Sequence, residues 1–203
     1  MKQEDLDSHV SPSAKITSGT FIGSREVPLE LRPRLLKHMR LISQHCVENA
    51  IEGWSGAAPG MDTVWRKSFE YFKGGEYFHQ ILPWNGFQDF YVDQERQYLL
   101  DEFMTTMASV MLFDCGVVWL HNLSRGVKAM YLRNVYQVVL PDYSQSDFVA
   151  YYAPVTKKGT PKGGTAIAVR LADTLGIPTF NLLFEEDALA LYELLGIKDD
   201  KEH

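Results

Sequence analysis

Short apolar runs alternate along this chain with longer stretches in which apolar side chains recur every three to four positions. The short runs predict about five β-strands, at residues 16–23, 51–55, 77–83, 147–154 and 179–183. The longer stretches have the period of amphipathic helices and predict them at residues 31–50, 61–72, 165–175 and 187–195. Because helices separate the strands, the pattern predicts an α/β fold, a three-layer sandwich around a mainly parallel sheet.

One further region, residues 93–139, has a long helical pattern. It is far longer than the average helix of a globular protein. Its interruptions near residues 114–116 and 124–126 therefore predict two or three helices.

The length of 203 residues suits one domain of this class. We assign the domain to residues 15–197, with a flexible tail at residues 1–14 and a frayed C-terminus at residues 198–203. No apolar run reaches the roughly 18 residues that a membrane span needs, so we expect no membrane partner.

Charge and cysteine content narrow the range of ligands. The formal net charge of −6 argues against a broad electrostatic footprint on DNA, but it is compatible with one basic pocket for a phosphate group. Cys46 and Cys115 lie far apart in apolar surroundings, which predicts buried free thiols and a cytoplasmic protein. No metal-ligand spacing accompanies them, so we expect no metal and no cofactor.

Three glycine-containing turns follow predicted strands or precede predicted helices, at residues 23–25, 54–62 and 163–165. Ligands of open α/β sheets bind at the carboxyl ends of the strands. The N–H groups at a helix start can hold phosphate oxygens, and glycine lets a backbone approach a ligand closely. The three turns together predict an anion-binding edge.

The residues of these turns resemble a known superfamily. Gly-Ser-Arg at residues 23–25, Ser-Gly-Ala-Ala-Pro-Gly-Met-Asp at residues 55–62 and Gly-Gly-Thr-Ala at residues 163–166 are similar to the Rossmann-like superfamily that joins DNA processing protein A (Smf) to the Lonely Guy proteins. The resemblance is strongest to phage-borne and bacterial DNA recombination-mediator A-like members of unassigned function, and it spans roughly residues 16–195. It implies a Rossmann-like fold, a nucleotide or nucleic-acid ligand, and the cytoplasm of a bacterium or of a phage-infected cell.

The turns and the resemblance together predict a nucleotide-binding site. Backbone N–H groups would hold the phosphate, with Ser24 and Thr165 adding hydroxyl groups and Arg25 a charge-assisted contact. Asp62, the candidate catalytic residue, would bind a sugar hydroxyl or cap its own helix. Trp84 would stack on a base or close the rim of the core. The predicted ligand-binding residues are Gly23, Ser24, Arg25, Ser55, Gly56, Ala57, Gly60, Met61, Asp62, Trp84, Arg133, Asn134, Gly163, Gly164 and Thr165.

Two alternatives to plain nucleotide binding stay open. The first is a single-stranded DNA-binding recombination mediator, which would use Arg25, Arg66, Lys67 and the basic loop at residues 156–162. The sequence also leaves a homo-oligomer open.

The second alternative is an N-glycosidic hydrolase of the Lonely Guy kind. In those proteins a glutamate stands three residues after the threonine of the glycine-rich turn, and here Ala168 occupies that position. The chemistry needs a carboxylate beside the sugar, so another one, such as Asp62, Asp89 or Asp142, would have to supply it.

Overall fold

The computed structural model of the protein describes residues 15–93 and 95–198. The tail predicted at residues 1–14 lies outside the described residues, as does most of the predicted frayed C-terminus. Six strands form one sheet in the order β4-β3-β2-β1-β5-β6, and every pairing is parallel. The strands are β1 Ser18–Gly23, β2 Glu52–Ser55, β3 Phe78–Leu82, β4 Gln97–Leu99, β5 Val149–Tyr152 and β6 Thr179–Asn181.

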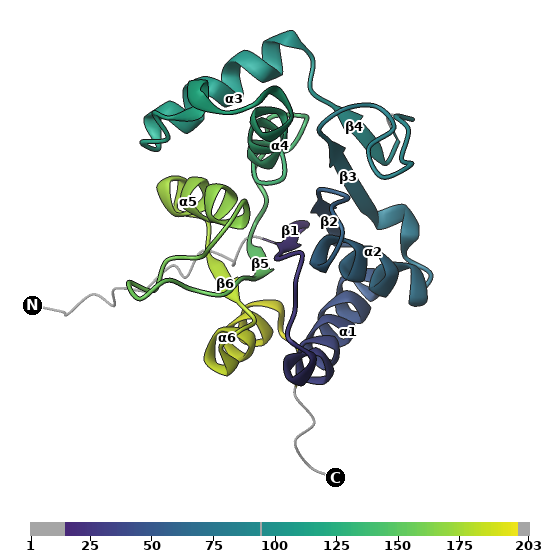
Figure 1. Cartoon of the computed structure of the whole chain (residues 1–203). Helices are drawn as coiled ribbons and strands as arrows, with labels where there is room; N and C mark the ends of the chain where they lie inside the picture. Colours follow the sequence, from purple (N-terminus) through teal and green to yellow (C-terminus); the bar gives the residue numbers. More distant parts are fainter. Residues whose placement is uncertain (1–14, 94, 199–203) are drawn as a thin grey trace, which may run out of the picture.

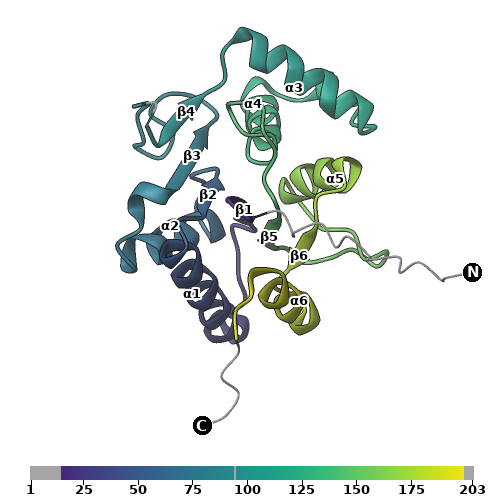
Figure 2. The ribbon, with the colours of Figure 1, turned by 180° about the vertical axis from the view of Figure 1, so that it is seen from behind.

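Helices cover both faces of this sheet (Figure 1). The α-helices are α1 Arg32–Glu48, α2 Met61–Tyr71, α3 Glu102–Asp114, α4 Arg125–Val135, α5 Thr165–Leu175 and α6 Glu185–Leu195. Short 3-10 helices are η1 Leu29–Leu31, η2 Gly75–Tyr77 and η3 Leu120–Asn122. Seen from the front and from behind, α3, α4 and α5 lie on one side of the sheet and α1, α2 and α6 on the other (Figures 1 and 2). The predicted three-layer α/β sandwich with a parallel sheet is confirmed.

Each face of the sheet has its own core. On the α1, α2 and α6 side, the ring of Phe21 packs against Trp65 and Phe148, with centroids 4.8 and 5.5 Å apart. The core of the other side contains the buried residues of α3, α4 and α5. Strand residues such as Phe21 and Ile22 point alternately to the two cores, and this places consecutive strands between two layers of helices.

The sequence pattern was wrong at one point. Residues 97–99 form strand β4 at the edge of the sheet, inside the region predicted to be helical. All three residues are only half-buried, and three residues are too few to show a strand period. The rest of that region contains two α-helices, α3 and α4, as the interruptions of the pattern predict.

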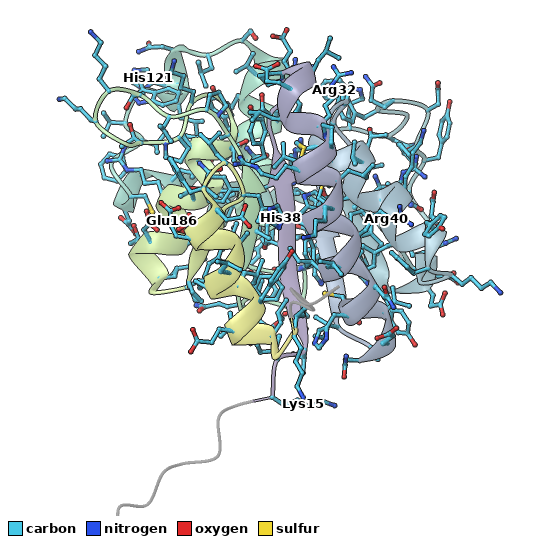
Figure 3. The ribbon with its side chains drawn as sticks, turned by 90° about the horizontal axis from the view of Figure 1, so that it is seen from below. Lys15, Arg32, His38, Arg40, His121 and Glu186 are labelled. Carbon is cyan, nitrogen blue, oxygen red and sulfur yellow. The ribbon has the colours of Figure 1, made fainter. Side chains whose placement is uncertain are left out.

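The two ends of the sheet are distinct. Lys15 precedes β1 and lies at one end of the molecule, whereas Arg32 at the start of α1 lies at the other, together with His121 (Figure 3). The carboxyl ends of the strands and the starts of α1, α2 and α5 therefore share one edge, which is where ligands of such sheets bind.

Candidate functional site

A cavity of about 450 Å³ opens at the carboxyl end of β1. Its walls come from the loop after β1, the start of α2, one face of α4 and the start of α5. Its volume falls within the range of roughly 300–1,000 Å³ usual for small-molecule sites. It is lined by Ile22, Gly23, Ser24, Arg25, Glu26, Ala58, Asp62, Val127, Met130, Tyr131, Arg133, Asn134, Gln137, Lys162, Gly163, Gly164 and Thr165.

Asp62 joins the ends of two strands beneath this cavity. Its carboxylate accepts hydrogen bonds from the N–H of Gly23 at 3.3 Å and of Ala58 at 3.2 Å. The side chain is almost completely buried, and burial raises the pKa of Asp62. The positive charge of Arg133 and the backbone N–H groups act in the opposite direction, towards a lower pKa. The carboxylate therefore fixes the loop after β2 against the end of β1.

Arg133 is the buried partner of this carboxylate, with Nη1 3.9 Å from Asp62 Oδ2. The same nitrogen donates to the carbonyl oxygen of Ile81 at 3.4 Å. Burial lowers the pKa of Arg133, and the charge of Asp62 counteracts this. Nε of Arg133 is buried and has no hydrogen-bond partner among the described residues. Arg133 thus lines the cavity, while its Nε stays buried without a protein acceptor.

Gly56 makes room for this arginine. A Cβ atom at position 56 would lie 1.1 Å from Arg133 Nη1, so a larger residue would displace the guanidinium. The N–H of Gly56 donates to the side-chain oxygen of Gln137 at 2.8 Å, which also accepts from Arg133 at 3.2 Å. This orientation of the Gln137 amide is the one that satisfies its neighbours. Gly56 therefore serves the packing of a protein side chain.

The polar network continues from α4 to the start of α5. The Gln137 amide nitrogen donates to Asn134 Oδ1 at 2.9 Å. Asn134 in turn donates through Nδ2 to the carbonyl oxygen of Gly164 at 3.0 Å. The Asp62–Arg133 ion pair and the hydrogen bonds that follow it thus connect Asp62, under the β1 and β2 loops, with the turn that opens α5. These contacts limit the arrangements open to the side chains of Gln137 and Asn134.

The mouth of the cavity carries the donors that remain. The N–H groups of Gly163, Gly164 and Thr165 have no acceptor among the described residues, and no side chain caps α5. Arg25 and Lys162 are exposed on two sides of the opening, where Glu26 contributes one negative charge. Helix N-termini and such cations attract anions.

The structure brings most of the predicted site residues together. Nine of them line the cavity: Gly23, Ser24, Arg25, Asp62, Arg133, Asn134, Gly163, Gly164 and Thr165. Six are not among the lining residues: Ser55, Gly56, Ala57, Gly60, Met61 and Trp84.

The central turn is engaged with protein groups. A Cβ atom on Gly60, whose φ is +93°, would lie 2.5 Å from Arg25 Cα, so this glycine lets two loops pack closely. The N–H of Met61 donates to the carbonyl oxygen of Ser24 at 3.1 Å. The N–H of Met61, like those of Gly56 and Ala58, has a protein acceptor, whereas the sequence predicted phosphate contacts along this turn. The N–H groups of Gly56, Ala58 and Met61 are therefore not free for a ligand.

Trp84 lies two residues beyond β3 and is 44% exposed, with its ring edge-to-face against Phe87 at a centroid distance of 5.0 Å. Its stacking on a base stays a prediction. The sequence predicted Arg133 and Asn134 on α4 as site residues but missed the apolar part of this wall. Val127, Met130, Tyr131 and Asn134 stand at i, i+3, i+4 and i+7, and this spacing is the signal that could have found them.

Two classes of site are missing from the described part of the chain. In residues 15–93 and 95–198, no three His, Cys, Asp or Glu side chains gather where they could hold a metal ion. No helix in these ranges is long and apolar enough to cross a membrane. Cys46 and Cys115 are buried free thiols, as predicted.

Comparisons with known proteins agree with the architecture. No family model and no curated protein matches the chain. A solved structure of DNA processing protein A from Helicobacter pylori, described for its single-stranded DNA binding mode, is similar at 16% sequence identity with a TM-score of 0.50. The match covers 90% of this chain and 74% of that one. At this identity the likeness shows the fold, and the chain has an α/β fold like that of DNA processing protein A.

Proposed function

We propose that the cavity binds a nucleotide, with the phosphate held between Arg25, Lys162 and the first N–H groups of α5. One observation carries this proposal: cationic side chains from distant segments and unpaired N–H groups line the same cavity, although the net charge of the chain is −6. Arginine, lysine and helix N-termini are common phosphate ligands in proteins.

The opposite wall suits the base of a nucleotide. Val127, Met130 and Tyr131 present an apolar surface from α4. Below this surface, the opposite charges of Asp62 and Arg133 compensate each other. The net charge that faces a ligand therefore comes from the residues at the mouth of the cavity. An apolar wall with a few convergent polar groups is typical of small-molecule sites.

The resemblance of the three glycine-containing turns to the superfamily supports a more specific placement of the chain. We place the chain among the phage-borne and bacterial recombination-mediator A-like members of the superfamily, acting in the cytoplasm of a bacterium or of a phage-infected cell. The glycine turn at residues 163–165 supports this placement because it stands at the start of α5, where a phosphate would bind.

Calorimetric titration of the full chain with adenosine monophosphate, deoxyadenosine monophosphate, adenosine and inorganic phosphate tests the assignment. We expect the monophosphates to bind and adenosine to bind much more weakly, because the phosphate makes the charged contacts. Equal affinity for adenosine and its monophosphate would contradict the phosphate assignment. Absence of binding by any mono-, di- or triphosphate of the four bases would contradict the proposal as a whole.

Single-stranded DNA is the second candidate, and the likeness to DNA processing protein A favours it. The loop that leads into the cavity exposes Lys157, Lys158 and Lys162. Trp84 offers an exposed ring beyond β3, and bases of single strands commonly stack on such rings.

Fluorescence anisotropy with labelled oligodeoxynucleotides separates the two candidates. A strand that contacts several phosphates loses affinity steeply with salt, by a log–log slope of about −0.7 per phosphate. Substitution of Trp84 and Lys158 by alanine would weaken oligonucleotide binding and leave mononucleotide binding intact. If only mononucleotides bind, the DNA candidate is excluded.

Hydrolysis of the nucleotide is less well supported. Of the carboxylates considered from the sequence, Asp62 lines the cavity, and Asp89 and Asp142 do not. Both oxygens of Asp62 already accept backbone N–H groups, and Oδ2 also faces Arg133. The geometry therefore favours binding over glycosidic cleavage.

A further inference from the structure

Helix α3 carries large apolar side chains on its outer side as well as on its inner side. Its inner side is buried in the core through Met104, Ala108 and Leu112. On its outer side Phe103, Val110 and Phe113 are 62%, 49% and 64% exposed. Exposed apolar side chains gathered on one surface commonly mark an interaction site.

Nothing in the described chain encloses this helix. Both views show α3 at the margin of the molecule, outside α4, with no described helix or strand beyond it (Figures 1 and 2). The exposed ring of Tyr143 extends the outer surface, with its centroid 6.3 Å from that of Phe103. We call the surface formed by Phe103, Thr106, Val110, Phe113 and Tyr143 the α3 face.

The spacing of the helical residues of the α3 face is the same in both directions along the helix. Phe103, Thr106, Val110 and Phe113 follow one another at steps of three, four and three residues. A two-fold axis through the middle of the helix would therefore set Phe103 of one copy opposite Phe113 of the other, and Thr106 opposite Val110. Interfaces of symmetric dimers need this kind of self-complementary surface.

The exposed area is also of the size that a dimer uses. At about 200 Å² for each aromatic side chain, Phe103, Phe113 and Tyr143 expose on the order of 350 Å², and Val110 adds to this. A standard interface buries about 800 Å² on each partner, of which about 57% is apolar. The α3 face thus supplies most of the apolar area that one partner contributes.

We propose that two copies of this chain associate through the α3 face, with their α3 helices packed antiparallel about a two-fold axis. No charged side chain lies within the stripe of Phe103, Thr106, Val110 and Phe113, so its burial leaves no unpaired charge. The cavity lies at the carboxyl end of β1, and no residue of the α3 face lines it, so dimerisation does not require the nucleotide.

The ends of the helix define the orientation of the pair. Glu102 and Asp114 stand at opposite ends of α3, and antiparallel packing brings Glu102 of one copy near Asp114 of the other. Arg170 lies near the C-terminal end of α3, since a Cβ atom on Gly116 would be 2.9 Å from Nη2 of Arg170. Glu102→Lys would replace the repulsion with an attraction and tighten an antiparallel dimer. In a parallel dimer the same change would exchange a Glu–Glu repulsion for a Lys–Lys repulsion and leave the dissociation constant about the same.

Sedimentation of the full chain over a range of concentrations tests the proposal. We expect a dimer whose dissociation constant rises about 100-fold in Val110→Glu and in Phe113→Glu, since charges would be buried without partners within the interface. Leu194→Glu is the matched control, because Leu194 is an exposed helical leucine of α6 and its change should leave the dimer intact. Thermal unfolding of each variant by circular dichroism verifies that it folds.

Two results would overturn the proposal. One is a wild-type chain that sediments as a monomer at every concentration. The other is a dimer whose dissociation constant is the same in Val110→Glu and in the wild type. Nucleotide binding is measured separately on the same variants, so failure of the dimer does not bear on the function of the cavity.

Discussion

Asp62 and Arg133 face each other beneath the cavity, with Oδ2 of the carboxylate 3.9 Å from Nη1 of the guanidinium, and both side chains are almost completely buried. They come from the start of α2 and from the end of α4. Loss of one partner leaves the other charge buried without compensation, which is far more costly than loss of an exposed pair.

We therefore expect Arg133→Met to lower the free energy of unfolding by about 3–5 kcal/mol. Urea denaturation followed by circular dichroism measures it. The matched control is Arg66→Met, because Arg66 forms a more exposed ion pair with Glu70 on the surface of α2. Such surface pairs contribute about 0.2–1 kcal/mol, so equal losses in the two variants would contradict the structural role of Arg133.

Gly56→Ala tests the packing of the same arginine. The added methyl group would occupy the place of Nη1, and displacement of the guanidinium should cost roughly 1–3 kcal/mol of stability. Gly75→Ala is the control, since the nearest atom to a Cβ there is Glu70 Cγ at 3.7 Å. Its unfolding free energy should change by no more than about 0.5 kcal/mol. A Gly56→Ala protein as stable as the wild type would show that the Arg133 side chain can adopt another conformation without loss of stability.

The glycine turns illustrate how far the sequence could predict the site. Their positions at strand ends and helix starts follow from local pattern, and the structure does bring residues 23–25 and 163–165 to one cavity. The partner of Gly56 could not be predicted. Glycine permits close approach, but the sequence does not say whether a ligand or a distant side chain such as Arg133 approaches it.

The central strands and the helices of the fold were predicted better than the edge strand of the sheet. Strands between two layers of helices are apolar on both sides, and such runs stand out in the sequence. The edge strand β4 has three half-buried residues, Gln97, Tyr98 and Leu99, and carries no such signal. The apolar part of the cavity wall on α4 was also missed, because a stripe such as Val127, Met130 and Tyr131 predicts a core-facing helix equally well.

Arg25→Ala should weaken binding of a nucleoside monophosphate by about 1.5–3 kcal/mol, the value of a hydrogen bond to a charged group. The side chain is exposed at the mouth of the cavity and contacts Met130 Sδ at 3.6 Å, so its loss should not affect folding. Calorimetric titration measures the change. Arg40→Ala is the control, because Arg40 lies on α1 over the ring of Tyr71, away from the cavity. If both variants bind like the wild type, the phosphate does not lie beside Arg25.

The surroundings of His38 allow a prediction of how the free energy of unfolding depends on pH. It is a residue of α1 (Figure 3) whose ring contacts α6, with Nδ1 2.7 Å from the Tyr192 hydroxyl and Nε2 3.2 Å from Glu185 Oε2. Burial lowers the pKa of His38 below 6.5, and this outweighs the opposite effect of Glu185. The unfolded chain therefore binds the proton more readily, and stability should fall as the pH drops below about 6.5.

The contribution of one histidine is at most about 1.4 kcal/mol per pH unit. Burial also lowers the pKa of His79, which acts in the same direction, so His38→Gln should reduce the slope without abolishing it. Urea denaturation at pH 7.5 and 5.5 of both proteins provides the comparison. Identical slopes in the variant and the wild type would show that His38 does not contribute.

The remaining prediction is that the protein binds nucleotides without releasing their bases. Cleavage of the glycosidic bond builds positive charge on the sugar, and a nearby carboxylate is the usual stabiliser. Ala168, at the position of the expected glutamate, is fully buried in the core and does not line the cavity, while Asp62 is occupied by two N–H groups and Arg133. Incubation with nucleoside monophosphates, followed by chromatography of free bases, should show no turnover. Base release that disappears in Asp62→Asn but persists in Asp89→Asn would instead make Asp62 the catalytic carboxylate and the protein a hydrolase.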